Sequence, residues 1–216
     1  MKLDRGFQTG VRITTSFTWQ KAMSWQSGDD GGLLFYVGTQ RNYARADFDR
    51  TLNFVQSYIY SLPFGKGKAY FTSGVGSKIM GGWSASGIPS LRSGSPLTIT
   101  ANGGSLNLPS STQTADQVKP VGARFGTSGR NTISGPGTYG LNAKLGRTFT
   151  LAGRKQLEVR AESLNVTNTP QFGNPGTNVS NMTRNADGSI RALNGYGEIT
   201  SAGGERQARF ALRLSF

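Results

Sequence analysis

Apolar and polar residues alternate along much of the chain, and a period of two predicts β-strands rather than helices. The clearest example is the C-terminal segment 206–216, where Phe210, Leu212, Leu214 and Phe216 share one parity. The same alternation extends over 1–8, 11–23, 49–62, 81–100, 139–151 and 155–166. Pro89 and its neighbouring glycines predict a bend or bulge within 81–100. The pattern therefore predicts an all-β chain of about seven strands, each with one apolar face.

The connections between these strands alternate in length. Short turns fall at 8–10 and 152–154, and an intermediate connection begins at 63–68 and extends as far as residue 80. Residues 73–78 within it resemble a phosphate loop only superficially, because the Gly-Lys-Ser/Thr ending and a helical pattern are missing. Long polar segments occupy 24–48, 101–138 and 167–204. Outer-membrane barrels have such a pattern, whereas soluble domains rarely contain structureless loops of this length.

Strand direction, counted backwards from a C-terminus on the periplasmic side, places each long loop outside and each shorter turn inside. Aromatic residues then gather at the inner strand ends, where barrels carry an aromatic girdle. This expected periplasmic girdle contains Phe7, Tyr60, Trp83, Phe149 and Phe216, and Trp19 and Tyr139 are candidates for the outer girdle. Taken singly, each aromatic residue would equally suit the core of a soluble β-sandwich. Together the features predict an antiparallel up-and-down transmembrane β-barrel segment.

Composition narrows the function. The chain of 216 residues has a net charge of +13, 35% hydrophobic residues, no Cys and no His. Thiolate and imidazole chemistry are therefore excluded, and we expect no enzyme, no cofactor and no metal site. The paired acidic residues at 29–30 and 47–49 lack an EF-hand pattern. A positive charge of this size suits nucleic-acid binding, contact with anionic lipid, or basic loops and a basic lumen.

The sequence resembles the C-terminal barrel portion of TonB-dependent outer-membrane receptors, most closely their Oar-like branch. The resemblance is carried by FTWQKA at 17–22, LPFGKG at 62–67, GGWSASGI at 81–88, SGSPL at 93–97, GRNTISGPG at 129–137, AESLNVTN at 161–168 and RFALRLSF at 209–216. It implies an energised importer with a barrel of about 22 strands and a plug in the lumen. Signal peptide, TonB box and plug are not seen in 1–216, so we expect a partial, C-terminal barrel segment.

Two groups of residues are candidate functional sites. The terminal Phe210, Leu212, Leu214 and Phe216 resemble the signal by which the barrel assembly machinery recognises its clients, although an ordinary amphipathic edge strand would look the same. The long loops contain candidate ligand-facing residues, for which solvated polar loops are the simpler alternative. These loop residues are Arg124, Arg130, Asn131, Arg184 and Arg191.

The leading hypothesis is therefore a receptor barrel fragment in the outer membrane of a Gram-negative bacterium, whose complete form takes up a scarce substrate with energy from the TonB complex. Its expected partners are outer-membrane lipid, lipopolysaccharide and the assembly machinery, with TonB reached only through regions upstream. One alternative is a basic soluble β-protein that binds nucleic acid, but aromatic residues and charges take opposite parities here, so no nucleic acid is expected. Another is a structural or adhesive surface protein.

Overall fold

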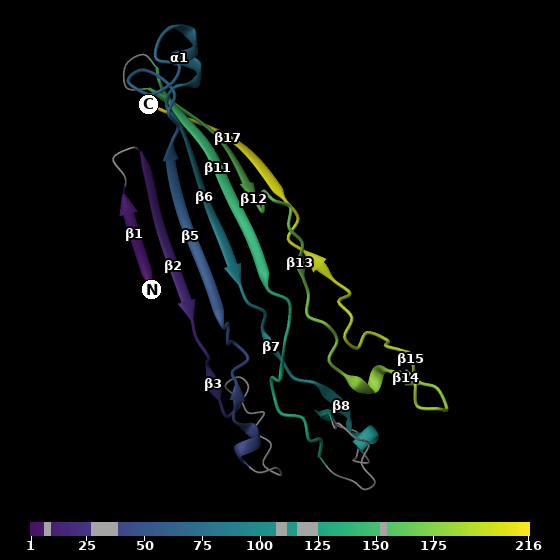
Figure 1. Cartoon of the computed structure of the whole chain (residues 1–216). Helices are drawn as coiled ribbons and strands as arrows, with labels where there is room; N and C mark the ends of the chain where they lie inside the picture. Colours follow the sequence, from purple (N-terminus) through teal and green to yellow (C-terminus); the bar gives the residue numbers. More distant parts are fainter. Residues whose placement is uncertain (7–9, 27–38, 107–111, 116–124, 152–154) are drawn as a thin grey trace.

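The computed structural model describes residues 1–6, 10–26, 39–106, 112–115, 125–151 and 155–216. Its main element is one open antiparallel sheet in which each strand lies next to its predecessor in the chain, and this confirms the all-β, up-and-down prediction (Figure 1). The strands, in sheet order, are β1 (Lys2–Gly6), β2 (Val11–Trp19), β5 (Leu52–Ser61), β6 (Trp83–Arg92), β11 (Thr138–Thr150), β12 (Gln156–Leu164) and β17 (Gln207–Ser215).

The two ends of the sheet differ in their connections (Figure 1). The C-terminus and the connection between β5 and β6 lie at one end, called here the short-turn end, and the long connections lie at the other, the loop end. The loop end contains short strands and 3₁₀ helices. They are β3 (Met23–Ser24), η1 (Thr39–Asn42), β4 (Ala44–Arg45), β7 (Pro96–Leu97), β8 (Thr100–Asn102), η2 (Gly103–Leu106), β9 (Thr112–Thr114), β10 (Ile133–Ser134), β13 (Gln171–Phe172), η3 (Val179–Asn181), β14 (Thr183–Arg184), β15 (Ile190–Ala192) and β16 (Ala202–Gly203).

A helix that the sequence did not predict, α1 (Gly74–Met80), lies in the connection between β5 and β6. It is only seven residues long and contains two glycines, so neither helical periodicity nor helix propensity signals it. The sequence analysis assigned this segment only to a connection between two strands. Contacts with the sheet, described below, hold a segment that would be unstable as an isolated helix.

The expected bulge at Pro89 is also absent from the structure. Strand β6 pairs with β11 in one continuous register, with Pro89 opposite Leu141. On the other side the register is the same at Val55↔Ser90 and at Tyr58↔Gly87, and only the two pairs between them are missing. Proline has no N–H to donate, so the ladder loses hydrogen bonds at this point without a shift of the strand.

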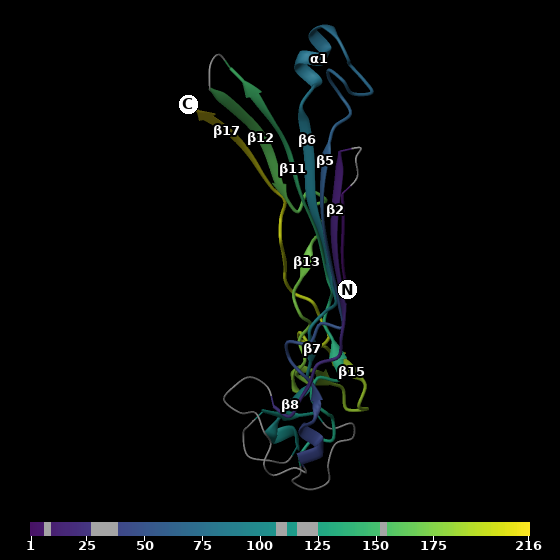
Figure 2. The same ribbon diagram turned by 90° about the vertical axis from the view of Figure 1, so that its left-hand side faces the viewer.

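In the part of the chain that the structure describes, the sheet is a single layer with no helix or second sheet over its long faces (Figure 2). Among the described residues the only buried hydrophobic side chains are Ala46, Ala101 and Ala115, all at the loop end. Both outer strands, β1 and β17, have a strand neighbour on one side only. The described residues therefore form a wall, without the packed interior that stabilises a soluble domain.

Candidate functional site

The register gathers apolar side chains on one side of the sheet, called here the apolar face. Phe54 of β5 is opposite Phe17 on one neighbour and Leu91 on the other. Further along, Ala161 is opposite both Leu145 and Phe210. Trp19 and Leu212 are both 75% exposed. A continuous apolar surface of this kind, without a covering layer, needs apolar surroundings such as lipid.

The opposite side, the polar face, contains a row of charged side chains across β11, β12 and β17. Glu158 Oε1 lies 3.6 Å from Lys144 Nζ and 4.0 Å from Arg160 Nη1, and Arg160 Nε lies 3.6 Å from Glu162 Oε1. Arg209 and Arg213 are the β17 partners of Glu162 and Glu158. These side chains are 27–39% exposed where the ion pairs form, so the face is wetted by solvent.

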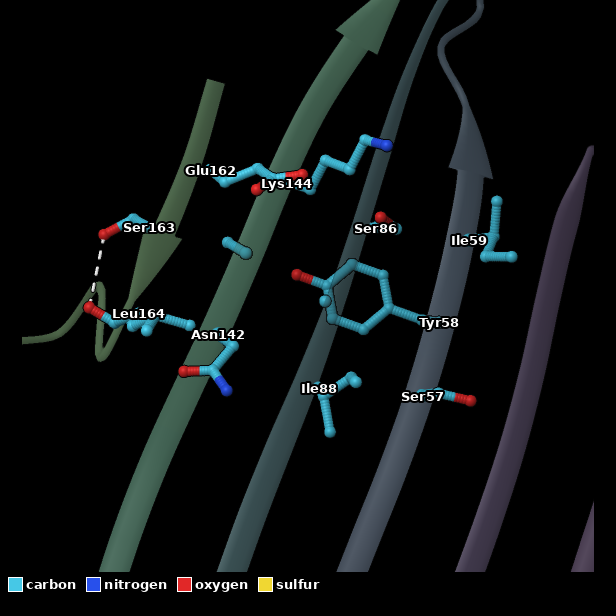
Figure 3. A pocket seen from close by; sticks show the side chains of 12 residues that line it. Ser57, Tyr58, Ile59, Ser86, Ile88, Asn142, Lys144, Glu162, Ser163 and Leu164 are labelled. Atoms are coloured by element: carbon cyan, nitrogen blue, oxygen red, sulfur yellow. Dashed lines mark hydrogen bonds between the residues drawn. The ribbon is translucent and has the colours of Figure 1, made fainter. Parts of the chain in front are cut away.

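A shallow hollow of about 450 Å³ lies on this polar face between β5, β6, β11 and β12 (Figure 3). Ile59 and Ile88, which are 52% and 46% exposed, are apolar residues of the polar parity that line it. Lys144 and Glu162 lie along its other side (Figure 3). The hollow is thus an apolar patch with a charged margin on an otherwise polar surface.

The predicted inner girdle residues Tyr60, Trp83 and Phe149 belong to the apolar parity and lie at the short-turn ends of β5, β6 and β11. Phe216, also assigned to this girdle, comes directly after β17 and is 86% exposed. Phe7 lies outside the described residues. A common position at one end of the apolar face is typical of an interfacial belt, and that role stays a prediction.

Arg147 is a cation on the apolar face that sequence reasoning did not single out. Its guanidinium carbon lies 4.0 Å from the centroid of the Phe149 ring. Arg147 Nη2 donates to the Lys78 carbonyl at 2.6 Å, and Nη1 donates to the Ile79 carbonyl, which also accepts from Trp83 Nε1 at 3.1 Å. The guanidinium of Arg147 and the indole N–H of Trp83 thus satisfy carbonyls at the C-terminal end of α1 that have no partner within the helix.

The predicted assembly signal lies on the edge strand β17. Phe210, Leu212 and Leu214 share the apolar face and are 85%, 75% and 49% exposed. Along one side β17 pairs with β12, and no described strand occupies its other side. An exposed apolar edge strand is suited to pairing with another strand, and its recognition by an assembly machine stays a prediction.

Arg130 and Asn131, two of the predicted ligand-facing residues, connect the long loops 24–48 and 101–138 at a contact called here the loop junction. Arg130 Nη2 donates to the carbonyls of Ser24 at 2.7 Å and Asn42 at 3.3 Å. Asn131 Nδ2 donates to the Arg45 carbonyl at 2.6 Å. Asn131 is only 5% exposed and has a φ of +56°. The geometry favours a structural role for both residues, while a ligand role in these loops stays a prediction.

The loop junction also contains Asp49, which is fully buried. Its Oδ1 accepts from the Ala22 N–H at 2.9 Å, and its Oδ2 lies 3.1 Å from Arg45 Nε. Asp47 Oδ1 accepts from Asn131 Nδ2. These acidic residues therefore act within the loop junction; Asp29 and Asp30 lie outside the described residues. In the described part of the chain no group of acidic side chains is arranged to hold a metal ion.

The remaining ligand-facing predictions have different outcomes. Arg184 and Arg191 are exposed in the hairpin of β14 and β15, whereas Arg124 lies outside the described residues. In the turn of this hairpin the Ser189 hydroxyl and N–H donate to Asp187 and lower the pKa of that carboxyl. The hairpin is thus an ordered basic feature of the loop end.

Sequence reasoning missed an exposed aromatic pair at the loop end. The rings of Trp25 and Tyr43 have centroids 4.8 Å apart, and the two residues are 51% and 50% exposed. Trp25 directly follows Ser24, and Tyr43 directly follows Asn42. The carbonyls of Ser24 and Asn42 both accept hydrogen bonds from Arg130. A Trp and a Tyr in polar loops were a possible signal, but their pairing depends on a fold that brings distant segments together.

The segment at 161–168 that supported the family resemblance forms a corner where β12 ends. Asn165 and Asn168 have φ angles of +46° and +51°, which asparagine tolerates better than most residues. Asn165 Nδ2 donates to the Thr169 carbonyl at 2.8 Å, and the Arg206 N–H donates to Asn168 Oδ1 at 3.0 Å. The motif therefore has a structural explanation at the loop end.

No helix in the described part of the chain has both the length and the hydropathy needed to cross a bilayer.

In comparisons with known proteins, a family model described as "Outer membrane beta barrel domain" matches residues 1–209. No curated protein and no solved structure matches the sequence. The matched range covers six of the seven strands of the main sheet completely, together with the first three residues of β17.

Proposed function

The chain belongs to the outer membrane beta-barrel domain family and is a protein of the bacterial outer membrane, and from this premise we propose that it forms part of the wall of a TonB-dependent receptor of the Oar-like type. One observation carries the proposal. It is an open antiparallel sheet with an apolar face, a polar face and long connections at one end only. Lipid on one side and a water-filled lumen on the other would stabilise both faces.

The open edges support a larger barrel. Strands β1 and β17 point the same way in Figure 1, so joining them directly would create a parallel pair in an otherwise antiparallel wall. Additional strands would cover both edges and complete an antiparallel barrel, for which the resemblance suggests about 22 strands. In this proposal the short-turn end is periplasmic and the loop end is extracellular.

The proposed activity is energy-coupled uptake of a scarce substrate. Its partners are outer-membrane lipid and lipopolysaccharide, the barrel assembly machinery, and the TonB complex through regions outside 1–216. The hollow beside Ile59 and Ile88 supports contact with a domain inside the lumen, because a partly apolar patch in a water-filled channel is stabilised when it is covered.

Uptake assays test this proposal in cells that carry or lack the native gene. Labelled iron chelates, oligosaccharides and oligopeptides are offered with and without a proton uncoupler. We expect accumulation of at least one of these to require both the gene and the proton gradient. Gene-dependent accumulation that is insensitive to the uncoupler for every labelled compound would contradict energy coupling and indicate a passive pore.

A surface adhesin is a second candidate, favoured by the exposed Trp25 and Tyr43 pair at the loop end. It predicts that cells lose attachment, and not uptake, when both residues are replaced by Ala. Nucleic-acid binding is less well supported, since stacking platforms need aromatic residues interleaved with cations on one exposed face. Here the aromatic belt and the row of ion pairs lie on opposite faces.

A further inference from the structure

The connection between β5 and β6, residues 62–82, is a folded unit at the short-turn end. Phe64 packs against Tyr70 and Phe71, with ring centroids 6.3 and 5.7 Å apart. Backbone hydrogen bonds of 2.9–3.0 Å close the loop, from the Gly65 N–H to the Tyr70 carbonyl and from the Tyr70 N–H to the Pro63 carbonyl. Gly65 and Gly81 touch so closely that a Cβ on Gly65 would lie 2.7 Å from the Gly81 Cα. The unit therefore presents its side chains from a defined scaffold.

This unit exposes large apolar side chains together with lysines. Tyr70, Phe71, Val75 and Ile79 are 61%, 54%, 71% and 60% exposed. The exposed cations of the unit are Lys66, Lys68 and Lys78, and the segment has no Asp or Glu. Exposed apolar residues beside cations, without anions, are the composition of a surface that binds an anionic membrane interface.

Hydrogen bonds from the sheet hold α1 next to the apolar face. The two side chains that bind its C-terminal carbonyls, Arg147 and Trp83, belong to the apolar parity of β11 and β6. Trp83 and Phe149 are also members of the inner aromatic belt. The C-terminal end of α1 therefore adjoins the part of the sheet that would contact lipid.

We propose that residues 62–82 form a membrane-interface anchor: Tyr70, Phe71, Val75 and Ile79 enter the interfacial layer of the inner leaflet, and Lys66, Lys68 and Lys78 bind anionic phospholipid headgroups. This inference rests on the proposed function, because it requires the apolar face to contact lipid and the short-turn end to be periplasmic. The anchor would fix the depth of the wall in the bilayer, as interfacial aromatic residues and cations do for other membrane proteins.

Lipid-quenching measurements on the purified native protein in nanodiscs test the insertion. A bimane label is attached to single cysteines at Val75→Cys and Ile79→Cys, with Asp187→Cys at the loop end as the water-exposed control and Leu145→Cys as the wall control. The probe is phosphatidylcholine with a nitroxide on its acyl chain, near the headgroup end for positions 75, 79 and 187 and near the methyl end for position 145. We expect quenching at positions 75, 79 and 145 and none at 187. Quenching at 145 without quenching at 75 and 79 overturns the anchor and leaves the wall intact, whereas no quenching at 145 contradicts the wall itself.

The lysines are tested with nitroxide-labelled phosphatidylglycerol against labelled phosphatidylcholine. Each Lys near an anionic surface contributes about fivefold in affinity, which corresponds to about 1 kcal/mol. We expect the preference of the labelled Ile79→Cys site for phosphatidylglycerol to be lost in the Lys66→Gln/Lys68→Gln/Lys78→Gln variant. It should persist in Lys21→Gln/Arg92→Gln/Arg206→Gln, which removes the same charge at the loop end. Equal preference in both variants, or none in the unmodified protein, overturns headgroup binding.

Discussion

Tyr58 and Gly87 lie opposite each other on β5 and β6, and the Tyr58 hydroxyl oxygen is 2.5 Å from the point that a Cβ at residue 87 would occupy. The Asn142 carbonyl is 2.8 Å from the same point. A glycine at this position lets the tyrosine side chain cover the neighbouring strand. This contact contributes to the packing of the middle of the sheet, where no second layer supplies it.

A methyl group at residue 87 should therefore destabilise the sheet. We expect Gly87→Ala to lower the free energy of unfolding by about 1–3 kcal/mol through overpacking. Gly140→Ala is the matched control, because its added Cβ would find only Ser90 Oγ at 3.7 Å. Its effect should stay within about 0.5 kcal/mol. Urea unfolding of the native protein in lipid vesicles measures both, and equal midpoints for the two variants would contradict this packing.

Charge should be tolerated on one face of β11 and not on the other. Leu145→Lys places a cation on the apolar face and should cost about 2–4 kcal/mol near the middle of the bilayer. Thr148→Lys places one on the polar face opposite Glu158, where the change should stay below about 1 kcal/mol. The same unfolding measurement applies, and a similar loss in both variants would argue against lipid on the apolar face.

The loop junction should depend on the amide of Asn131. Asn131→Asp keeps the side-chain shape but turns a donor into a carboxylate that faces the Arg45 carbonyl and Asp47 Oδ1. We expect a local cost of about 3 kcal/mol, because a buried charge loses its partners. External protease added to intact cells should then cleave residues 39–50 faster. Asn194→Asp, at an exposed residue that also has a positive φ, is the control and should not change the cleavage rate.

The end of β17 should control assembly in the outer membrane. Replacing Phe216 with Ala removes the terminal apolar side chain, and we expect a several-fold fall in folded protein, measured as the form whose electrophoretic mobility changes on heating. Ser215→Ala, on the opposite parity, should leave the yield unchanged. An unchanged yield for Phe216→Ala would assign β17 an ordinary edge-strand role.

The main sheet was predictable because apolar and polar residues alternate along every long strand, which gives one apolar and one polar face. Each strand observed in the sheet overlaps a range read from the sequence, and the ion-pairing residues Lys144, Glu158, Arg160 and Glu162 share the parity expected for them. The strand ranges and the parity of each face follow from the local alternation of apolar and polar residues, so no knowledge of distant contacts was needed. The family match confirms the outer-membrane location, while the size of the barrel and the TonB coupling stay proposals.

The features that the sequence did not reveal depend on partners far away in the chain. Arg130 binds Ser24 across 106 positions, so its use within the loops could not be separated from ligand binding. Helix α1 is fixed by Arg147, 69 positions from Lys78. Pro89 indicated a bulge locally, yet the pairing of β6 with β11 keeps the strand in register. In each case tertiary contacts outweighed the local signal.

Accessibility of successive residues on β11 tests the central claim most directly, namely that the sheet is a barrel wall with lipid on its apolar face. Single cysteines replace residues 141–145 in turn in the native protein, which is kept in outer membranes and treated with a charged maleimide or labelled with bimane beside nitroxide lipid. The account predicts lipid quenching at 141, 143 and 145, with maleimide reaction favoured at 142 and 144. Uniform maleimide reaction at all five positions, without lipid quenching at any of them, would contradict it.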